Sequence, residues 1–366
     1  MSLFPGNLSA AVVAVSSADL RRMVWLARLL DRLSRQPAYR TAVAPLTPAA
    51  ARFDPGHAAV MMGYDFHLTP AGPRLIEVNT NTGGLLPAWL AGHPGTPWPE
   101  HLKTRLAETF ALEMSARSRG ELRRPRRVVI LDDAPAGQFL YPEMQAFADL
   151  FREQGVAATI VDPAGLDASS TGVFLEGAPV DLVYNRHCDF YLETPATAGL
   201  REAYLAGTVC LTPNPFAYGL LADKRRMTLW HDQALLSSCG LSGAQIDRLR
   251  TMVPECRLLA DGDRDALWRE RGAWVFKPVD RFGSRGVLVG EKMTRGRFEQ
   301  LDPATTLVQR LVPPSLTEVP GFGAMKTDVR LFAYRDRVLA VTARLYRGQV
   351  TNLRTEGGGF AAVKVV

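Results

Sequence analysis

Apolar residues recur along the chain with two different spacings, and each spacing predicts a different kind of element. Over 20–33 and again over 102–114 they repeat every three or four positions, which predicts two amphipathic helices, the first N-capped by Ser17. Between these helices, residues 63–79 hold two apolar runs on either side of a turn signal at 69–72, so we expect a β-hairpin there. Residues 1–118 are therefore expected to fold as a hairpin flanked by two helices.

The predicted hairpin carries three oxygen-bearing side chains that we expect to share one face. Pairing its arms around the turn sets Asp65 opposite Glu77, and side-chain alternation brings Asn79 out beside Glu77. Two carboxylates that face each other across a ladder repel unless a cation lies between them. This set suits Mg²⁺, which prefers oxygen ligands and usually also binds waters and substrate phosphates. The alternative is an ordinary exposed hairpin whose acids face water.

After a polar and basic linker at 119–124, the middle of the chain alternates apolar runs with helical patterns. The predicted strands lie at 128–131, 158–161, 182–184 and 209–211, with helices near 138–154 and 197–206 and a hairpin around 172–179. This alternation predicts a small parallel sheet, and the missing GxGxxG motif argues against dinucleotide binding. Arg186 follows the third of these strands, at the edge where such sheets bind ligands. It could hold a substrate carboxylate or be an ordinary surface arginine.

The last third of the chain contains a loop whose composition suits polyphosphate binding. Lys277 ends the apolar strand 274–277, and Gly283, Ser284 and Gly286 follow before the strand 287–289. Glycines let backbone N–H groups turn inward, and a lysine at the end of the strand neutralises phosphate charge. The GxxxxGK[ST] order is absent, so this is not a Walker A loop. An ordinary β-hairpin is the alternative.

Other residues of the last third could complete such a site. Lys224, on a predicted helix, would add a phosphate contact, or else be an exposed helix lysine. Residues 309–311 end the short strand 306–309 and could form a hinge whose backbone binds adenine. Strands at 329–334 and 338–345 carry Arg330 and Arg344, which could stabilise charge on a transferred phosphoryl group. Alternatively, these arginines form cross-strand ion pairs that contribute under ~1 kcal/mol.

Composition narrows the class of protein. At 366 residues the chain has room for two or three domains, and 47% hydrophobic with 22% charged residues is typical of a soluble globular protein. Only six of the 43 basic residues are lysines, so a lysine at a motif position is more informative than usual. The net charge of +6 suits anionic substrates, while no aromatic-basic motif favours nucleic acid.

Cysteine usage and the apolar runs bear on the cellular compartment. The four cysteines are widely spaced without CxxC, so we expect reduced core residues. No signal-peptide pattern is visible at the N-terminus, and no run approaches the ~18 apolar residues of a membrane span. We therefore expect a cytoplasmic protein that binds neither nucleic acid nor membrane.

In order along the chain, five segments resemble the ATP-binding half of ATP-grasp ligases. These segments are 221–224, 276–278 with 281–286, 307–311, 326–330 and 351–352. In those ligases the last motif of the series is an acid-bearing strand followed by E-x-N. In this chain the matching residues, Asp65, Glu77 and Asn79, lie in the first third of the sequence instead. The chain thus resembles a circularly permuted ATP-grasp protein, arranged like eukaryotic glutathione synthetase. Residues 76–80 with 83–84 are similar to its metal motif, and 183–186 to a substrate-binding stretch.

The resemblance implies an α/β (α+β) ATP-grasp fold in four parts. It implies a permuted metal-binding part at 1–118, an inserted Rossmann-like substrate domain at 125–215, and ATP-grasp subdomains at 216–290 and 291–366. The implied nucleotide-binding residues are Lys224, Lys277, Gly283, Ser284, Gly286, Gln309, Arg310, Leu311, Glu318 (as ribose ligand) and Lys326. The implied Mg²⁺ ligands are Asp65, Glu77 and Asn79, and the catalytic residues facing the γ-phosphate are Arg330, Arg344 and Asn352. Substrate contacts fall on Asn81, Gly83, Gly84 and Arg186.

One position departs from the resemblance. Permuted glutathione synthetases carry a glutamate in the glycine-rich loop as a metal ligand, whereas this chain has Arg281, so Asp280 or Asp65 must substitute. The function implied is an ADP-forming, ATP- and Mg²⁺-dependent ligase that joins an amino-acid or short-peptide carboxylate to an amine or thiol through an acyl phosphate. A phosphotransferase with a hydroxyl acceptor and a non-catalytic nucleotide-binding scaffold stay open as alternatives. Related ligases are often homodimers.

Overall fold

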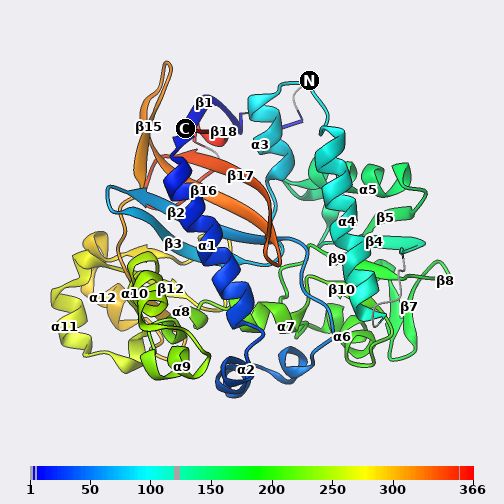
Figure 1. Ribbon diagram of the computed structural model, residues 1–366, viewed down its shortest axis with the longest axis horizontal. Helices are drawn as coiled ribbons and strands as arrows, with labels where there is room; N and C mark the ends of the chain where they lie inside the picture. The colour runs from blue at the N-terminus through cyan, green and yellow to red at the C-terminus, as the bar shows by residue number, and fades with distance from the viewer. Residues whose placement is uncertain (1–2, 5, 119–123, 354) are drawn as a thin grey trace.

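The largest sheet joins strands from both ends of the chain (Figure 1). The computed structural model describes residues 3–4, 6–118, 124–353 and 355–366, so the predicted linker lies, except for residue 124, outside the described residues. The strand order is β1-β18-β17-β16-β2-β3, with β15 paired to the first half of β16 and β2 to its second half. The bounds are β1 (Leu8–Val15), β2 (Met62–Thr69), β3 (Gly72–Asn79), β15 (Ser315–Val319), β16 (Gly323–Tyr334), β17 (Arg337–Tyr346) and β18 (Gly359–Val365).

The predicted hairpin is confirmed, and its register is the expected one. Strands β2 and β3 pair around the turn, with Asp65 opposite Glu77 and a bulge between Asp65 and Phe66. The other edge of β2 pairs with β16, which sets Asp65 directly opposite Arg330 as well. The hairpin is therefore inside a sheet, next to strands from the last third of the chain.

Helix α1 (Ser17–Leu33) crosses one face of the large sheet (Figure 1). Its buried residues, including Met23, Leu26 and Leu30, pack into the core beneath that face. The predicted N-cap is wrong by one residue, because Ser16 has the extended backbone of a cap and its side chain accepts from the Asp19 N–H. Ser17 is the first residue of the helix.

The predicted parallel sheet is confirmed as four strands in the order β10-β9-β4-β5. Its strands are β4 (Arg127–Leu131), β5 (Ala157–Val161), β9 (Leu182–Asn185) and β10 (Cys210–Thr212). Helices α3 (Leu85–Gly92), α4 (Glu100–Arg117) and α5 (Tyr141–Glu153) form a core with this sheet and with the end of β16. Helix α6 (Ala198–Leu205) packs into a third core, beside a small sheet of β6 (Asp167–Ser169), β7 (Gly172–Leu175) and β8 (Ala178–Pro179).

A buried polar network centred on Glu113 joins these layers. Glu113 on α4 accepts hydrogen bonds from the hydroxyls of Tyr334 (2.7 Å) and Thr212 (2.9 Å) and from the Ala58 N–H (3.0 Å). Its other neighbour is the His57 Nδ1 at 2.9 Å. Burial alone would lower the pKa of His57, but Cys210 and Glu113 raise it to about 10. A buried charge with this many partners fixes how the two large sheets sit together.

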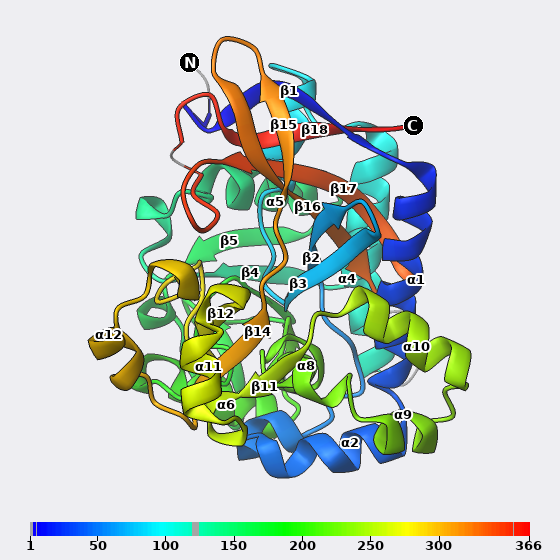
Figure 2. The same ribbon diagram turned by 90° about the vertical axis from the view of Figure 1, so that its left-hand side faces the viewer.

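A third sheet lies below the large one in Figure 2, surrounded by short helices. Its antiparallel order is β11-β14-β12-β13, with β11 (Cys256–Leu258), β12 (Trp274–Pro278), β13 (Leu288–Val289) and β14 (Thr306–Arg310). The helices around it and beside α1 are α2 (Pro37–Val43), α7 (Pro215–Ala217), α8 (Arg226–Leu229), α9 (Gln233–Ser238), α10 (Gly243–Met252), α11 (Arg264–Arg269) and α12 (Arg295–Glu299).

Lys224 does not lie on a helix as predicted. A π-helical turn (Tyr218–Ala222) ends before Asp223, and Lys224 occupies the turn that precedes α8. All four cysteines are free, and three of them are buried while Cys188 is half-buried. Within the part of the chain that the structure describes, no helix combines the length and the apolar character needed to cross a membrane.

Candidate active site

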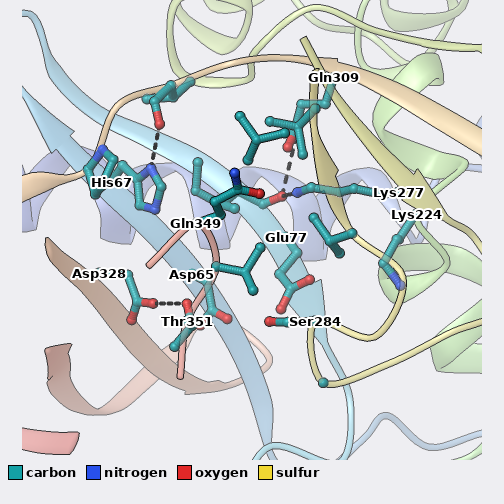
Figure 3. Close-up of a pocket in the computed structure, with 18 of the residues that line it drawn as sticks. Asp65, His67, Glu77, Lys224, Lys277, Ser284, Gln309, Asp328, Gln349 and Thr351 are labelled. Atoms are coloured by element: carbon teal, nitrogen blue, oxygen red, sulfur yellow. Dashed lines mark hydrogen bonds between the residues drawn. The ribbon is translucent and has the colours of Figure 1, made fainter. Parts of the chain in front are cut away.

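A cavity of about 550 Å³ lies between the large sheet and the sheet of β11–β14 (Figure 3). Its walls come from β2 and β3, from the β12–β13 loop, from the end of β14 and from β16 and β17. Thirteen of the predicted site residues line it: Asp65, Glu77, Asn79, Asn81, Lys224, Lys277, Gly283, Ser284, Gln309, Arg310, Leu311, Lys326 and Arg344. The hairpin of the first third and the lysines of the last third thus face one space.

Asp65, predicted as a metal ligand, is held by two arginines. Its side chain is buried, and Arg330 donates two hydrogen bonds to it, each 2.6 Å long. Arg344 donates a third at 2.9 Å and the Asn79 amide a fourth at 3.2 Å. Burial alone would raise the pKa of Asp65, but the charges of Arg330 and Arg344 hold it well below its usual range. Four donors therefore converge on the two carboxylate oxygens of Asp65, and three of the four come from arginines.

Asp328 completes this network from β16. It lies opposite Arg344 and accepts from the Arg344 Nε at 2.6 Å through Oδ1, and from the Thr351 hydroxyl at 2.8 Å through Oδ2. Two carboxylates and two guanidinium groups are therefore interleaved in the buried part of the sheet. The cross-strand ion pairs that the sequence suggested as an alternative are present, but they are buried, so that breaking one costs more than the ~1 kcal/mol expected for an exposed pair.

Glu77 is an acidic side chain of the cavity that remains available. Among the described residues, no cationic group lies within 4.0 Å of its carboxylate, and the Asn79 amide donates to it at a long distance of 3.4 Å. Figure 3 shows Glu77 and Ser284 pointing toward one another across the space. No cluster of three or more His, Cys, Asp or Glu side chains suited to a metal occurs in the described ranges.

Lys277 is a buried cation without a carboxylate partner in the described part of the chain. It is 5% exposed, and its ammonium group donates to the Ile76 carbonyl at 3.1 Å. Burial lowers the pKa of Lys277, because desolvation disfavours the charged form. An ammonium group has three N–H donors. Lys277 therefore faces the cavity with donors to spare for an anion.

Three further lysines, Lys224, Lys292 and Lys326, line the cavity. Lys224 donates to the Arg281 carbonyl in the β12–β13 loop at 2.5 Å, and Lys326 donates to the Gly348 carbonyl after β17 at 2.5 Å. Both bonds are to neutral acceptors, so these two charges are not cancelled. With Lys277, the lysines that line the cavity come from three separate segments of the chain.

The β12–β13 loop adopts the backbone that its glycines predicted. Gly283, Ser284 and Gly286 have φ values of +61°, +62° and +74°. This left-handed region is open to glycine and rare for serine, so the turn around Ser284 is tightly specified. Arg281 and Phe282 of the same loop also line the cavity, while Asp280 is exposed outside its lining.

The segment 309–311 lines the cavity but does not offer its N–H groups. The Arg310 N–H donates to the Glu255 carbonyl and the Leu311 N–H to the Ala273 carbonyl, both at 2.8 Å. The Gln309 amide donates to the Ile76 carbonyl at 3.3 Å. A base bound here would meet side chains and carbonyl groups rather than free backbone donors.

His67 is a cavity residue that the sequence interpretation missed. It lies on β2 two residues beyond Asp65, and its Nδ1 is 2.7 Å from the Val312 carbonyl oxygen. Burial lowers the pKa of His67. Strand alternation could have identified it, because residues two apart on a strand share a face.

The fold is similar to that of several solved structures. A glutathione synthetase-like effector from Globodera pallida, in its apo form, matches 98% of this chain and 90% of its own at 11% identity, with a TM-score of 0.62. A putative γ-glutamylcysteine synthetase from Methylobacillus flagellatus matches 93% of this chain and 86% of its own at 11% identity, with a TM-score of 0.51. The fold is glutathione-synthetase-like.

At such low identity the likeness concerns this glutathione-synthetase-like ATP-grasp fold and not the activity. The ATP-grasp ligase PsnB with minimal precursor, Mg and ADP matches 65% of this chain and 88% of its own at 15% identity, but a TM-score of 0.28 carries no weight. Neither family models nor curated proteins gave a match.

Within the glutathione-synthetase-like fold, seven predicted residues do not line the cavity: Gly83, Gly84, Arg186, Gly286, Glu318, Arg330 and Asn352. Glu318 is exposed on β15, so the proposed ribose ligand is not brought to the cavity. Asn352 is exposed after β17. Arg330 is buried, where Asp65 and the Gly83 carbonyl (3.1 Å) take up its donors.

The predicted substrate residues Gly83, Gly84 and Arg186 lie in tightly packed surroundings. The Arg186 guanidinium donates to the Thr82 carbonyl at 2.8 Å and lies 3.8 Å from Glu143. A Cβ on Gly83 would lie 2.2 Å from the Arg186 side chain, and one on Gly84 2.2 Å from the Phe360 ring. Close contact explains these glycines, and Asn81, which donates to the Arg186 carbonyl at 3.0 Å, is the predicted substrate residue that lines the cavity.

Proposed function

We propose that this protein is an ATP- and Mg²⁺-dependent ligase that joins a carboxylate to an amine or a thiol and releases ADP and phosphate. The observation that carries the proposal is the single cavity faced by Glu77 from the first third of the chain and by Lys277 from the last third. Such a site combines an acid for a cation with cations for a polyphosphate.

The same observation supports a circularly permuted ATP-grasp arrangement. In this proposal residues 1–118 supply the metal-binding part, 125–215 form an inserted Rossmann-like substrate domain, and 216–290 and 291–366 form the two ATP-grasp subdomains. The pairing of β2 with β16 supports the permutation, because it completes one sheet from the first and last of these parts.

The residues present fit a nucleotide. Lys277 has N–H donors available in a buried position, Lys224 and Lys326 bond to neutral carbonyls, and the loop around Ser284 has the left-handed backbone of an anion-binding turn. In the proposal these lysines hold the phosphates, and Gln309 to Leu311 border the base.

The residues present also fit Mg²⁺, with one change from the sequence prediction. Glu77 and Asn79 would hold the ion together with phosphate oxygens, whereas Asp65 and the exposed Asp280 would not. Mg²⁺ is commonly bound through one or two carboxylates plus substrate phosphates, so a single carboxylate is sufficient. When bound, the ion would neutralise charge between the phosphates.

Arg344 is the residue that we assign to the transferred phosphoryl group. Asp65 and Asp328 hold its guanidinium at the wall of the cavity, which orients a cation without movement during the reaction. In the reaction, the substrate carboxylate takes the γ-phosphoryl group from ATP to give an acyl phosphate and ADP. The amine or thiol then forms the new bond as phosphate leaves and its proton passes to solvent.

Phosphate release tests this function. Purified protein is incubated with ATP, Mg²⁺ and mixtures of amino acids, short peptides, polyamines and thiols, while ADP and free phosphate are measured separately. A ligase releases both in equal amounts; ADP without free phosphate would indicate a phosphotransferase, and neither product would indicate a binding protein. We expect Lys277→Ala and Glu77→Gln to abolish release, and Lys364→Ala, at an exposed position on β18, to leave it unchanged. Full activity in the first two variants would refute the site.

A further inference from the structure

His67 has one ring nitrogen whose role is fixed and one that is free. Its Nδ1 lies 2.7 Å from the Val312 carbonyl oxygen, which can only accept a hydrogen bond. The proton of the neutral ring is therefore on Nδ1, and Nε2 carries a lone pair. His67 lines the cavity, and within the described residues Nε2 has no hydrogen-bond partner.

His67 lies between the segment that borders the base and the residues proposed to hold the phosphates. Val312, to which His67 is tied, directly follows the segment 309–311 that borders the base. On its other side, β2 pairs with β16 so that Phe66 lies opposite Val329, which makes Asp328 and His67 near neighbours. The phosphate-binding lysine Lys277 comes from the separate sheet of β11–β14, and its ammonium group reaches the Ile76 carbonyl on β3, the strand paired with β2.

The cavity also lacks the acceptor that the sequence suggested for ribose. Glu318 is exposed on β15 and does not line the cavity. Each oxygen of Asp328 already accepts a hydrogen bond, one from Arg344 and one from Thr351. In this corner of the described structure, Nε2 of His67 is an acceptor that no protein donor has taken.

We propose that His67 accepts a hydrogen bond from a ribose hydroxyl of the bound nucleotide and so distinguishes ribonucleotides from deoxyribonucleotides. This inference rests on the proposed function, which puts a nucleotide in the cavity. A buried acceptor left unpaired is costly, so loss of the hydroxyl should weaken binding about tenfold.

Two substitutions test the roles of the two His67 ring nitrogens separately. His67→Asn can keep a donor toward Val312 while it removes the acceptor, and His67→Gln can keep a polar atom near the position of Nε2. Titration calorimetry of Mg²⁺ complexes of ATP, 2′-deoxy-ATP and 3′-deoxy-ATP is performed with the wild type and both variants, and thermal unfolding checks that each is folded.

The expected result is a wild type that binds one deoxy analogue about tenfold more weakly than ATP. His67→Asn should bind ATP as weakly as that analogue, with no preference among the three, and His67→Gln should keep part of the preference. Equal wild-type binding of all three nucleotides, or an unchanged preference in His67→Asn, would overturn the assignment to His67. No binding of ATP at all would instead refute the proposed function.

Discussion

Replacing Asp65 with asparagine tests whether this residue serves arginines or a metal ion. The substitution preserves shape and removes one buried negative charge. In the folded protein that charge receives two hydrogen bonds from Arg330 and one from Arg344. Without it, two buried guanidinium groups lose a shared counterion, while Asp328 still pairs with Arg344. Removing one partner of a buried ion pair costs about 3–5 kcal/mol, so we expect a loss of this size.

A metal-ligand role predicts the opposite sign. Asp65 lies opposite Glu77 in the hairpin, and without a cation the two carboxylates would repel each other. Under that role, Asp65→Asn in the absence of metal would raise stability by under ~1 kcal/mol. The direction of the change therefore decides between the two roles.

Urea unfolding with EDTA, followed by circular dichroism, measures the change. With a slope of about 3 kcal/mol per molar urea, a loss of about 3 kcal/mol lowers the midpoint by about 1 M. Glu77→Gln is the matched control, since Glu77 makes no ion pair within the described residues and should unfold close to the wild-type midpoint. An unchanged or raised midpoint for Asp65→Asn would refute the arginine network as a source of stability.

The contribution of Asp65 to the stability of the folded protein should depend on pH with a definite sign. The pKa of Asp65 is lower in the folded state than its ordinary value near about 3.9 in the unfolded state. Its contribution to stability is therefore complete above about pH 4 and is lost as the pH falls below that value toward the folded pKa. The stability gap between wild type and Asp65→Asn should narrow over the same acidic range.

Two more substitutions test the packing around the site. Glu113→Gln removes the buried charge that pairs with His57, so unfolding measurements should show a loss of about 3–5 kcal/mol. An unfolding midpoint of Glu113→Gln equal to that of the wild type would contradict this expected loss. Gly84→Ala puts a Cβ 2.2 Å from the Phe360 ring at a φ of +105°, and should lower the melting temperature and soluble yield. Gly95→Ala, with a φ of +71° and open space around it, is the control for backbone strain alone.

The hairpin and the parallel sheet were predictable because their signals are local. A turn signal between two apolar runs fixed the register that sets Asp65 opposite Glu77. The role of Asp65 was not predictable, because the partner of its charge is Arg330, 265 positions away in the sequence. A hairpin alone does not show what pairs with its second edge.

Strands β1 and β18 are among those that escaped the sequence interpretation, and each did so for a physical reason. β1 alternates between buried and exposed positions, yet its sequence LSAAVVAV is apolar or small on both faces, so no polar period of two is visible. β18 begins at Gly359, directly after two other glycines, and such a run of glycines is typical of a loop. Lys224 was misplaced onto a helix because a π-helical turn ends just before it.

The pairing of β2 with β16 and of β1 with β18 has a consequence for synthesis of the protein. On the ribosome, β1 to β3 emerge long before the strands that complete their sheet. Until residues 323–365 are made, these early strands present open edges that could pair with other chains. Their final pairing must also bridge most of the polypeptide, which makes it a slow step. We infer that, until translation ends, the edges of β1 to β3 must be kept from pairing with other chains.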